Sequence, residues 1–312
     1  MPHFMFLRQR LMFLRQRHRP SLPTCLFATL LLVAGGNAFA ARCVDDDAGR
    51  RVCLEQPAER IVALSPGATE LLFNAGAGER LVGAVSFSDF PPAAKALPRV
   101  GSYKRLDMEA VLALKPDLVV AWISGNPETQ VQRLEELGLT VYRSEPLRFA
   151  DVADTLERFS VLAGTERTGR AAADHFRDGI AALRHRYADA DPVPVFYEVW
   201  EEPLMTVNGE HLISEAIRVC GGVNVFADLP TLAPRIGKEA VIAKDPEAIV
   251  AGGMGEDNPE WLEPWKRFPA LTAVQRDNLF FVPPSTLQRP TPQMLEGTRL
   301  LCRHLETARA RR

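Results

Sequence analysis

Short apolar runs alternate with amphipathic segments along most of this 312-residue chain. In the clearest example, the nearly all-apolar run 117–122 is followed by a glycine-containing turn, a helical pattern and a second apolar run. A run of this kind is typical of a strand in a parallel sheet that is covered on both faces. Asn126 is expected to cap the helix, with Pro127 at its first position. The segment predicts a βαβ unit with Trp122 at the carboxyl end of its first strand, where ligands bind in open α/β sheets.

The same pattern recurs in the second half of the chain. Residues 115–121 read Lys-Pro-Asp-Leu-Val-Val-Ala, and residues 245–251 read Asp-Pro-Glu-Ala-Ile-Val-Ala. Each is followed by a glycine break, a helical pattern and another apolar run. Two halves with one local pattern predict two α/β lobes, although so short a match is also compatible with chance. Further strands and helices are predicted at 60–64, 67–75, 81–85, 108–114, 149–163, 193–199, 212–219, 238–243, 259–268, 279–282 and 292–308.

Between the two halves lies a long proline-free segment rich in alanine, arginine and leucine. Its apolar residues recur at three-to-four spacing over 165–188, which predicts a single amphipathic helix. We therefore predict an α/β fold with two parallel-sheet lobes joined by one long rigid helix. The expected boundaries are a signal peptide at 1–40, an N-terminal hairpin at 41–58, an N-terminal lobe at 59–164, the connecting helix at 165–190 and a C-terminal lobe at 191–312.

The first 40 residues differ from the rest in charge and hydropathy. They hold five arginines and no acidic residue, then the apolar run 26–34, and they end in Ala38-Phe39-Ala40. This pattern is typical of a secretory signal cut after Ala40, and the apolar run is too short to span a bilayer. A repeated Met-Phe-Leu-Arg-Gln-Arg makes Met12 an alternative start of translation. Because no cysteine lies in a lipobox-like context, we expect soluble export.

The charge of the chain after export excludes some partners. Without the five arginines of the signal, 32 basic residues face 39 acidic ones, a net charge of −7. This balance argues against nucleic acid or an anionic membrane as a partner. It is typical of a freely diffusing soluble protein, which we expect to be a monomer.

Four cysteines remain after the signal: Cys43, Cys53, Cys220 and Cys302. An even number in an exported protein favours two disulfides, with three connectivities open. Cys43 and Cys53 flank a segment with the pattern of a hairpin, its turn near 47–49, so we predict that they pair. This leaves Cys220, at the end of a predicted helix, with Cys302 in the terminal helix. A metal site for the four thiols is disfavoured because the chain has no Cys-x-x-Cys pair.

Motifs for catalysis are absent from the sequence. We find no Gly-x-Ser-x-Gly elbow, phosphate-binding loop, His-Glu-x-x-His motif or dinucleotide fingerprint. Ser65 follows a predicted strand and is better explained as a helix N-cap than as a nucleophile. The histidines His175, His185, His211 and His304 lie in helical or surface-like contexts. We therefore predict no catalytic or metal-ligating residues, and keep a secreted α/β hydrolase as a competing hypothesis.

Aromatic and arginine side chains gather at predicted strand ends and loops. This set comprises Phe87, Phe90, Tyr103, Trp122, Trp200 and Arg289. A single tryptophan at the end of a strand often does no more than cover the core. Several such side chains from both lobes, facing one cleft, would form a wide apolar pocket with a few polar contacts.

Several runs resemble a known family. The run 60–66, Arg-Ile-Val-Ala-Leu-Ser-Pro, followed by Thr69-Glu70, resembles the opening of substrate-binding proteins of ABC importers for metal chelates and cobalamin. The resemblance continues in 88–92 (Ser-Asp-Phe-Pro-Pro), 114–122 and 219–226 (Val-Cys-Gly-Gly-Val-Asn-Val-Phe) and spans residues 60–302. The segments around Trp122 and Cys220 are most similar to the periplasmic cobalamin-binding branch.

This resemblance implies a ligand cleft between the lobes, location in the periplasm, and cobalamin as a transported ligand rather than a cofactor. It also implies delivery to the membrane permease of an ABC transporter, on which Glu128 and Glu239 would dock. Cys220 and Cys302 match a disulfide of the branch. The ligand-binding side chains expected from the resemblance and from the strand ends are Ser65, Phe87, Tyr103, Trp122, Trp200, Met205 and Arg289.

The chain departs from the branch at several places. Ala233 stands where the branch can carry a tryptophan, and Ser285 where it can carry an aspartate. Met205 replaces an aromatic residue, and the cysteine-flanked hairpin is additional. Haem and ferric siderophores are alternative ligands. Haem favours an axial His or Tyr, for which Tyr103 is the candidate, and siderophores favour several arginines, of which Arg289 is the one expected in the cleft.

Overall fold

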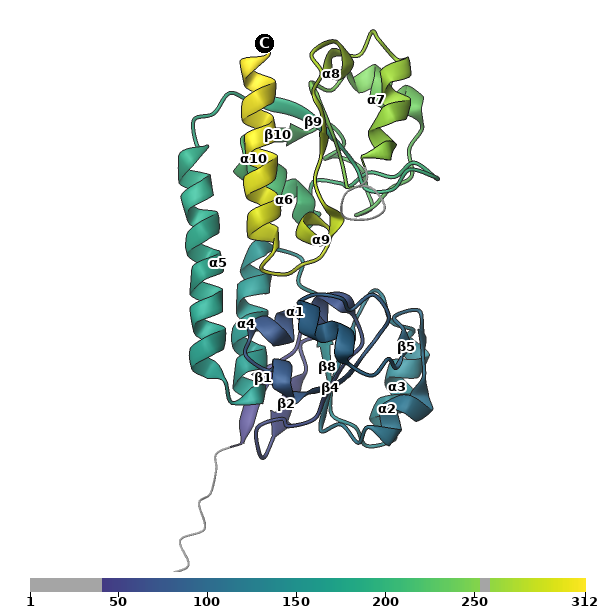
Figure 1. Cartoon of the computed structure of the whole chain (residues 1–312), viewed down its shortest axis with the longest axis vertical. Helices are drawn as coiled ribbons and strands as arrows, with labels where there is room; N and C mark the ends of the chain where they lie inside the picture. The colour runs from purple at the N-terminus through teal and green to yellow at the C-terminus, as the bar shows by residue number, and fades with distance from the viewer. Residues whose placement is uncertain (1–40, 253–258) are drawn as a thin grey trace, which may run out of the picture. The chain divides into compact units, whose positions relative to one another are not determined.

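The computed structural model describes residues 41–252 and 259–312. The signal peptide expected at 1–40 lies outside these residues. The described residues form two lobes, each built around its own parallel sheet (Figure 1). Within these two ranges, no helix is both long and apolar enough to cross a membrane.

The N-terminal lobe contains a four-stranded parallel sheet. Side chains of its strands alternate between two hydrophobic clusters, with Ile61 and Val120 in one and Val62 and Val119 in the other. Both faces are therefore buried, which confirms the prediction from continuous apolar runs. Neighbour by neighbour, the strands are β4 (Leu81–Ala84), β3 (Ile61–Ala63), β7 (Leu118–Trp122) and β8 (Val141–Ser144).

Helices and short elements complete this lobe. The α-helices are α1 (Pro66–Asn74), α2 (Met108–Ala113), α3 (Glu128–Glu136) and α4 (Phe149–Ala163). Smaller elements are the 3₁₀ helices η1 (Gly78–Arg80) and η2 (Pro92–Ala96) and the strand pair β5 (Gly101–Ser102) and β6 (Arg105–Leu106). The helix predicted at 149–163 matches α4, which ends at Gly164 in a left-handed conformation.

The C-terminal lobe repeats this architecture. Its parallel sheet consists of β10 (Gly222–Asn224), β9 (Val193–Glu198), β11 (Ala248–Ala251) and β12 (Leu279–Phe281). Its helices are α6 (Leu212–Val219), α7 (Lys238–Lys244), α8 (Thr272–Gln275), α9 (Pro284–Leu287) and α10 (Met294–Ala310). The short helix predicted at 259–268 is present as a 3₁₀ helix, η3 (Glu260–Arg267), with Pro264 inside it.

The short sequence repeat corresponds to equivalent positions in the two sheets. When the four strands of each sheet are numbered in chain order, both sheets have the order 2-1-3-4. The repeat supplies the third strand in each case, β7 in the N-terminal lobe and β11 in the C-terminal lobe. Lys115 and Asp245, the first residues of the two copies, have φ angles of 46° and 42°. This left-handed conformation is uncommon outside glycine. The two segments therefore share a backbone conformation as well as a pattern, which favours a structural repeat over chance.

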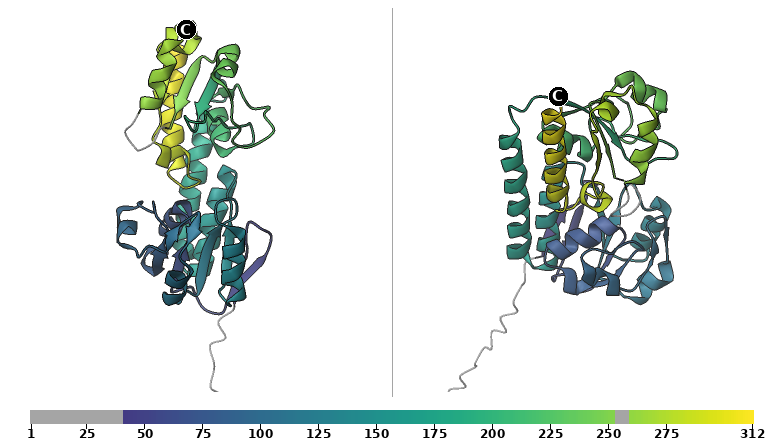
Figure 2. Two further views of the ribbon diagram at one scale, coloured as in Figure 1. Left: turned by 90° about the vertical axis from the view of Figure 1, so that its right-hand side faces the viewer. Right: turned by 45° about the horizontal axis from the view of Figure 1, so that its top comes forward.

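The long helix predicted between the halves is confirmed as α5 (Glu166–Arg186), which runs beside α4 and α10 (Figures 1 and 2). Two of its glycines permit close packing. A β-carbon at Gly169 would lie 2.2 Å from the β-carbon of Ser160 in α4, and one at Gly179 would lie 2.4 Å from Leu295 in α10. One helix is thus packed tightly against an element of each lobe. This supports the expectation of a rigid connection.

Both predicted disulfides are confirmed. Cys43 and Cys53 face each other across β1 (Arg42–Asp45) and β2 (Arg51–Leu54), and they are bonded. Cys220, at the end of α6, is bonded to Cys302 in α10. In the part of the chain that the structure describes, no group of three His, Cys, Asp or Glu side chains could hold a metal ion.

Candidate functional site

The carboxyl end of β7 is held by Asn126, whose role differs from the prediction. The Asn126 side chain accepts a hydrogen bond from the Trp122 backbone N–H at 2.7 Å. It donates two others at 2.9 Å, to the carbonyls of Leu64 and Tyr103. The residue that caps α3 is Pro127, without a side-chain hydrogen bond, so the expectation that Asn126 caps this helix is wrong. Asn126 instead joins the ends of β3 and β7 to the loop at Tyr103.

The end of β3 leads directly into α1 through Ser65. Its Oγ accepts a hydrogen bond from the Ala68 N–H at 3.0 Å. The N-cap interpretation of Ser65 is therefore confirmed, and the hydroxyl is already used in holding the helix. Pro66 follows as the first residue of α1, and both residues line a cavity described below.

The Trp122 indole is fixed by Glu145, which follows β8. The indole Nε1–H donates to Glu145 Oε1 at 3.2 Å, and the Ser124 backbone N–H donates to Oε2 at 2.7 Å. The Tyr103 ring lies against the indole, with 5.6 Å between the ring centroids and an interplanar angle of 49°. The carboxylate and the neighbouring ring together hold the tryptophan side chain at the edge of the sheet.

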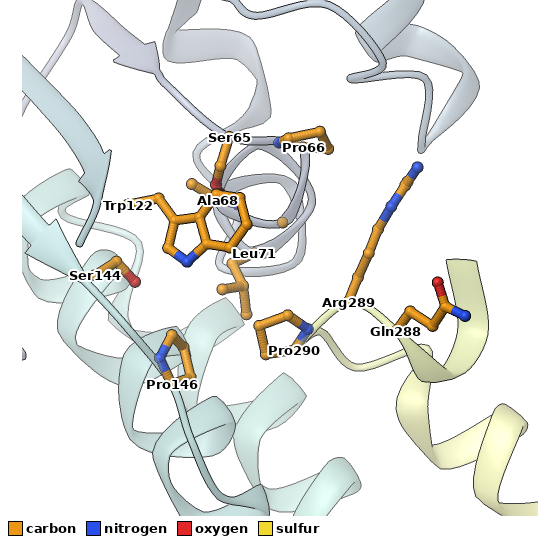
Figure 3. Close-up of a pocket in the computed structure, with 11 residues that line it drawn as sticks. Ser65, Pro66, Ala68, Leu71, Trp122, Ser144, Pro146, Gln288, Arg289 and Pro290 are labelled. Atoms are coloured by element: carbon orange, nitrogen blue, oxygen red, sulfur yellow. Dashed lines mark hydrogen bonds between the residues drawn. The ribbon is translucent and has the colours of Figure 1, made fainter. Parts of the chain in front are cut away.

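Two adjoining cavities lie between the lobes at this edge. Their volumes are about 180 and 190 Å³. Trp122 and Pro146 of the N-terminal lobe line both, as do Gln288, Arg289 and Pro290 of the loop after α9. Figure 3 shows the first of the two cavities. Each cavity is smaller than a typical pocket for a whole drug-sized molecule. The cavities would therefore hold part of a large ligand rather than enclose it.

The Arg289 guanidinium makes no hydrogen bond or ion pair with any residue in 41–252 or 259–312. The side chain is half-buried, and it extends from the loop after α9 in Figure 3. A guanidinium presents five donors and keeps its charge. It is thus available to acceptor groups of a ligand in the cleft.

Large apolar side chains remain exposed after the carboxyl ends of strands in both lobes. Phe87 follows β4 and is 66% exposed, and Trp200 follows β9 and is 41% exposed. Phe87 also has a φ of 65°, which is unusual for a bulky side chain. Ile123 and Leu147 follow β7 and β8 and are exposed as well. Leu147 lines the second cavity, whereas Phe87, Trp200 and Ile123 present apolar surface outside both cavities.

The structure brings some of the expected ligand-binding residues together and keeps others apart. Ser65, Trp122 and Arg289 line the cavities, and the Tyr103 ring lies tilted against Trp122. Phe87, Trp200 and Met205 line neither cavity. Met205 is paired through its backbone with Trp200, whose ring packs on Trp261 with a centroid distance of 5.6 Å. For all seven expected residues, a role in binding stays a prediction.

Sequence reasoning missed His211, which lines the second cavity. Its Nδ1 accepts a hydrogen bond from the Ile213 N–H at 3.1 Å and caps α6. Burial lowers the pKa of His211 to about 4. The imidazole is therefore neutral near pH 7, with its proton on Nε2. His211 directly precedes the helix predicted at 212–219, and its imidazole can accept a hydrogen bond. This position is the signal in the sequence that could have identified it as a cap.

Sequence reasoning also missed the buried carboxyl group of Glu70 in α1. This residue is fully buried, and its oxygens have no hydrogen-bond partner within the described residues. Burial raises the pKa of Glu70 to about 7, against the opposing influence of Thr291, Gln293 and Arg289. These three residues belong to the loop that follows α9. A titratable group of one lobe therefore faces the loop of the other.

We predict that, as pH rises from 5 to 8, the Glu70→Gln variant loses less stability than the unaltered protein. The raised pKa means that the folded protein binds the proton more tightly than the unfolded chain, so the group favours folding at low pH. Stability falls as pH rises from the ordinary pKa of 4.5 to about 7, by up to about 3 kcal/mol. Urea unfolding at several pH values, with and without the substitution, measures this difference.

Glu198 provides the reference for this experiment. It is buried too, and burial raises its pKa to about 7. It stays in both proteins and contributes equally to both curves. Parallel stability curves for the unaltered protein and Glu70→Gln would show that the Glu70 pKa is not raised.

The fold and cleft define a class, namely two-lobed α/β proteins with an apolar site between lobes that share a long helix. The sequence model of the periplasmic binding protein family matches residues 61–286. The chain belongs to the periplasmic binding protein family. It is thus a binding protein, and the hypothesis of a secreted hydrolase is set aside.

Relatives cover both lobes. The chain is 37% identical over 252 residues to a vitamin B12-binding protein of Vibrio cholerae, covering 81% of this chain and 91% of the relative. It is 33% identical over 250 residues to a vitamin B12-binding protein of Yersinia pestis, covering 80% and 87%.

Solved structures of periplasmic binding proteins are similar to this chain across both lobes. The crystal structure of a periplasmic vitamin B12-binding protein of Vibrio cholerae superposes with a TM-score of 0.74 at 36% identity, covering 81% of this chain and 98% of that one. A periplasmic haem-binding protein of Roseiflexus superposes with a TM-score of 0.72 at 21% identity, covering 80% and 99%. The second similarity concerns the fold alone.

Proposed function

We propose that this protein captures cobalamin between its lobes in the periplasm and delivers it to the permease of an ABC transporter. The observation that carries the proposal is the similarity across both lobes to proteins named vitamin B12-binding protein. The expected secretory signal accounts for the location. In this account Ser65, Trp122 and Arg289, which line the cavities, bind the ligand, and Tyr103 lies against the Trp122 indole.

The chemistry of the cleft suits a corrinoid. Cobalamin presents a broad, largely apolar corrin face with carboxamide groups at its rim, and it carries a phosphodiester in its nucleotide loop. Trp122 and the prolines Pro146 and Pro290 offer an apolar wall in both cavities. The Arg289 guanidinium offers donors to amide carbonyls or to the phosphodiester. Because the cavities are small, we expect the rest of the ligand to contact the exposed apolar strand ends.

The hydrogen bond of His211 argues against haem as the main ligand. Haem iron is coordinated through a lone pair of an axial ligand, and the candidates near the cleft are a histidine nitrogen and a tyrosine oxygen. Since His211 Nδ1 accepts from Ile213 N–H, the other nitrogen, Nε2, carries the proton and has no lone pair to offer. Tyr103, the other candidate, lines neither cavity. The His211 Nε2–H is instead a donor suited to an amide carbonyl.

A fluorescence titration of the exported form tests the choice of ligand. Cyanocobalamin, haemin and a ferric hydroxamate siderophore are added separately, and tryptophan emission is followed. We expect saturable quenching by cyanocobalamin, and weaker, non-saturating changes with the other two. If only haemin bound saturably, haem would be the ligand and the proposed binding of cobalamin would be wrong.

Glu128 and Glu239 are proposed to dock on the permease. Each lies in the first turn of its helix, α3 or α7, and each is exposed. Arg143 forms an ion pair with Glu128 at 2.7 Å, although the Glu128 side chain remains 52% exposed. A basic pocket of the permease would compete with Arg143 for this carboxylate.

We predict that the double substitution Glu128→Gln and Glu239→Gln weakens the complex with the permease by about 2- to 30-fold, which is the expected range for two exposed charge pairs. Affinity for cobalamin should not change. Complex formation is measured with permease in detergent or nanodiscs at several salt concentrations, because screening should weaken contacts between exposed charges.

The matched control replaces Glu136 and Glu263 by Gln, again one exposed glutamate in each lobe. This control should leave complex formation unchanged. If both double variants behaved like the unaltered protein and lost only a little thermal stability, the two glutamates would serve only to stabilise their helices.

A further inference from the structure

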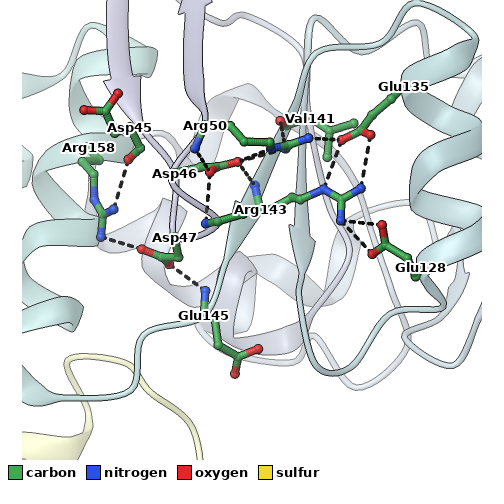
Figure 4. Close-up of polar contacts among 11 residues, drawn as sticks. Asp45, Asp46, Asp47, Arg50, Glu128, Glu135, Val141, Arg143, Glu145 and Arg158 are labelled. Carbon is green, nitrogen blue, oxygen red and sulfur yellow. Dashed lines mark hydrogen bonds and ion pairs between the residues drawn. The ribbon is translucent and has the colours of Figure 1, made fainter.

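The hairpin of β1 and β2 is fastened to the N-terminal lobe by its turn. The Asp46 side chain is fully buried. It accepts hydrogen bonds from the Arg50 guanidinium at 2.9 Å and from the Arg143 backbone N–H at 3.3 Å. The Asp47 N–H donates to the Arg143 carbonyl at 3.0 Å. The turn therefore lies against β8 (Figure 4).

Ion pairs strengthen this attachment on both sides of β8. Arg50 binds Glu135 of α3 at 2.6 Å, and Arg158 of α4 binds Asp47 at 2.8 Å. Arg143 also binds Glu135, at 3.1 Å. The hairpin is thus joined to two helices and one strand. The Cys43–Cys53 bridge joins β1 to β2, so these contacts attach the hairpin to the lobe as one unit.

One contact of the turn leads directly to the cleft. Asp47 Oδ2 accepts a hydrogen bond from the Glu145 backbone N–H at 2.6 Å (Figure 4). Glu145 is the first residue after β8, and its carboxylate receives both the Trp122 indole N–H and the Ser124 N–H. An unbroken series of hydrogen bonds therefore runs from the hairpin to the aromatic ring that lines both cavities.

We infer that the hairpin positions Trp122 for the ligand, with Asp47 and Glu145 as the positioning residues. This inference rests on the proposed function in taking Trp122 as a ligand-binding side chain. Asp47 fixes the backbone of Glu145, and Glu145 fixes the plane of the indole. A ring already held in its binding orientation loses less side-chain freedom when the ligand arrives, which favours tight binding.

The test compares Asp47→Ala with Asp45→Ala in the full exported chain. Asp45 lies in the same hairpin, and its carboxylate pairs only with Arg51 among the described residues, at the surface. In ligand-free protein, Asp47→Ala should raise the acrylamide quenching constant of Trp122, and Asp45→Ala should not. The same measurement in a Trp122→Phe background identifies the contribution of Trp122 among the four tryptophans.

Affinity for cyanocobalamin provides the second readout. Asp47→Ala should weaken binding by about 2- to 12-fold, the equivalent of one hydrogen bond, and should have no further effect in the Trp122→Phe background. Equal weakening in both backgrounds would mean that the hairpin acts on the fold in general and would overturn the inference. The same conclusion follows if Asp47→Ala and Asp45→Ala behave alike.

Glu145→Gln provides a variant that preserves the size of the side chain. It retains one carbonyl oxygen but cannot accept both hydrogen bonds as a carboxylate does, so it should also raise acrylamide quenching of Trp122. No change in quenching would overturn the role of Glu145. If the unaltered protein fails to bind cyanocobalamin, the proposed function is wrong, and acrylamide quenching in the ligand-free protein alone decides the inference.

Discussion

Removal of the Cys220–Cys302 bridge, as Cys220→Ala with Cys302→Ala, is expected to lower the free energy of unfolding by about 4.5 kcal/mol. The bridge spans 82 residues of sequence, and in the chain-entropy model a long loop restricts the unfolded chain strongly. Both cysteines are fully buried in the core, so alanine is a better replacement than serine, which would bury a hydroxyl group. Urea unfolding under oxidising conditions measures the difference.

The hairpin bridge provides the comparison for this prediction. Cys43 and Cys53 are separated by only 10 residues, so their replacement by alanine should cost about 3 kcal/mol. The order of the two effects is the decisive result. A larger loss for the hairpin bridge, or a loss below 1 kcal/mol for Cys220–Cys302, would show that loop entropy does not govern the stabilisation.

Substitution of Trp122 by alanine is expected to weaken cyanocobalamin binding by about 5- to 150-fold. The indole contributes to the walls of both cavities, and loss of one aromatic contact surface corresponds to about 1–3 kcal/mol. The Glu145 carboxylate would also lose the hydrogen bond that it now accepts from the indole N–H. Calorimetric titration of the variant and the unaltered protein gives the ratio.

Trp200→Ala is the matched comparison. Trp200 is also a tryptophan at the end of a strand, but it packs on Trp261 and lines neither cavity. We expect a smaller effect from its loss. Unchanged affinity in Trp122→Ala, with strong weakening in Trp200→Ala, would move the binding site away from the two cavities.

The sheets and the long helix could be predicted because their signals are local. Buried parallel strands appear as continuous apolar runs, and α5 appears as a regular three-to-four spacing. The role of Asn126 could not be predicted in the same way. Its side chain binds the Leu64 carbonyl, 62 residues away in the sequence. A residue before a proline and a helix suits a cap equally well, and only the three-dimensional contacts decide between the two roles.

The candidate site was predicted in part for a similar reason. Trp122 and Ser65 stand at strand ends, a position that the sequence reveals. Glu145 and His211 acquire their roles from contacts with the indole and with the cavity, and these contacts depend on how elements pack. Glu70 appeared as an ordinary acidic residue near a helix start, whereas its pKa is raised by burial against the loop after α9.

Equilibrium dialysis of the purified exported form against cyanocobalamin tests the central claim most directly. The account predicts one cobalamin bound per protein chain at saturation, with no displacement by an equal concentration of haemin. Retention of no cobalamin above that of a control protein, or complete displacement by haemin, would contradict it.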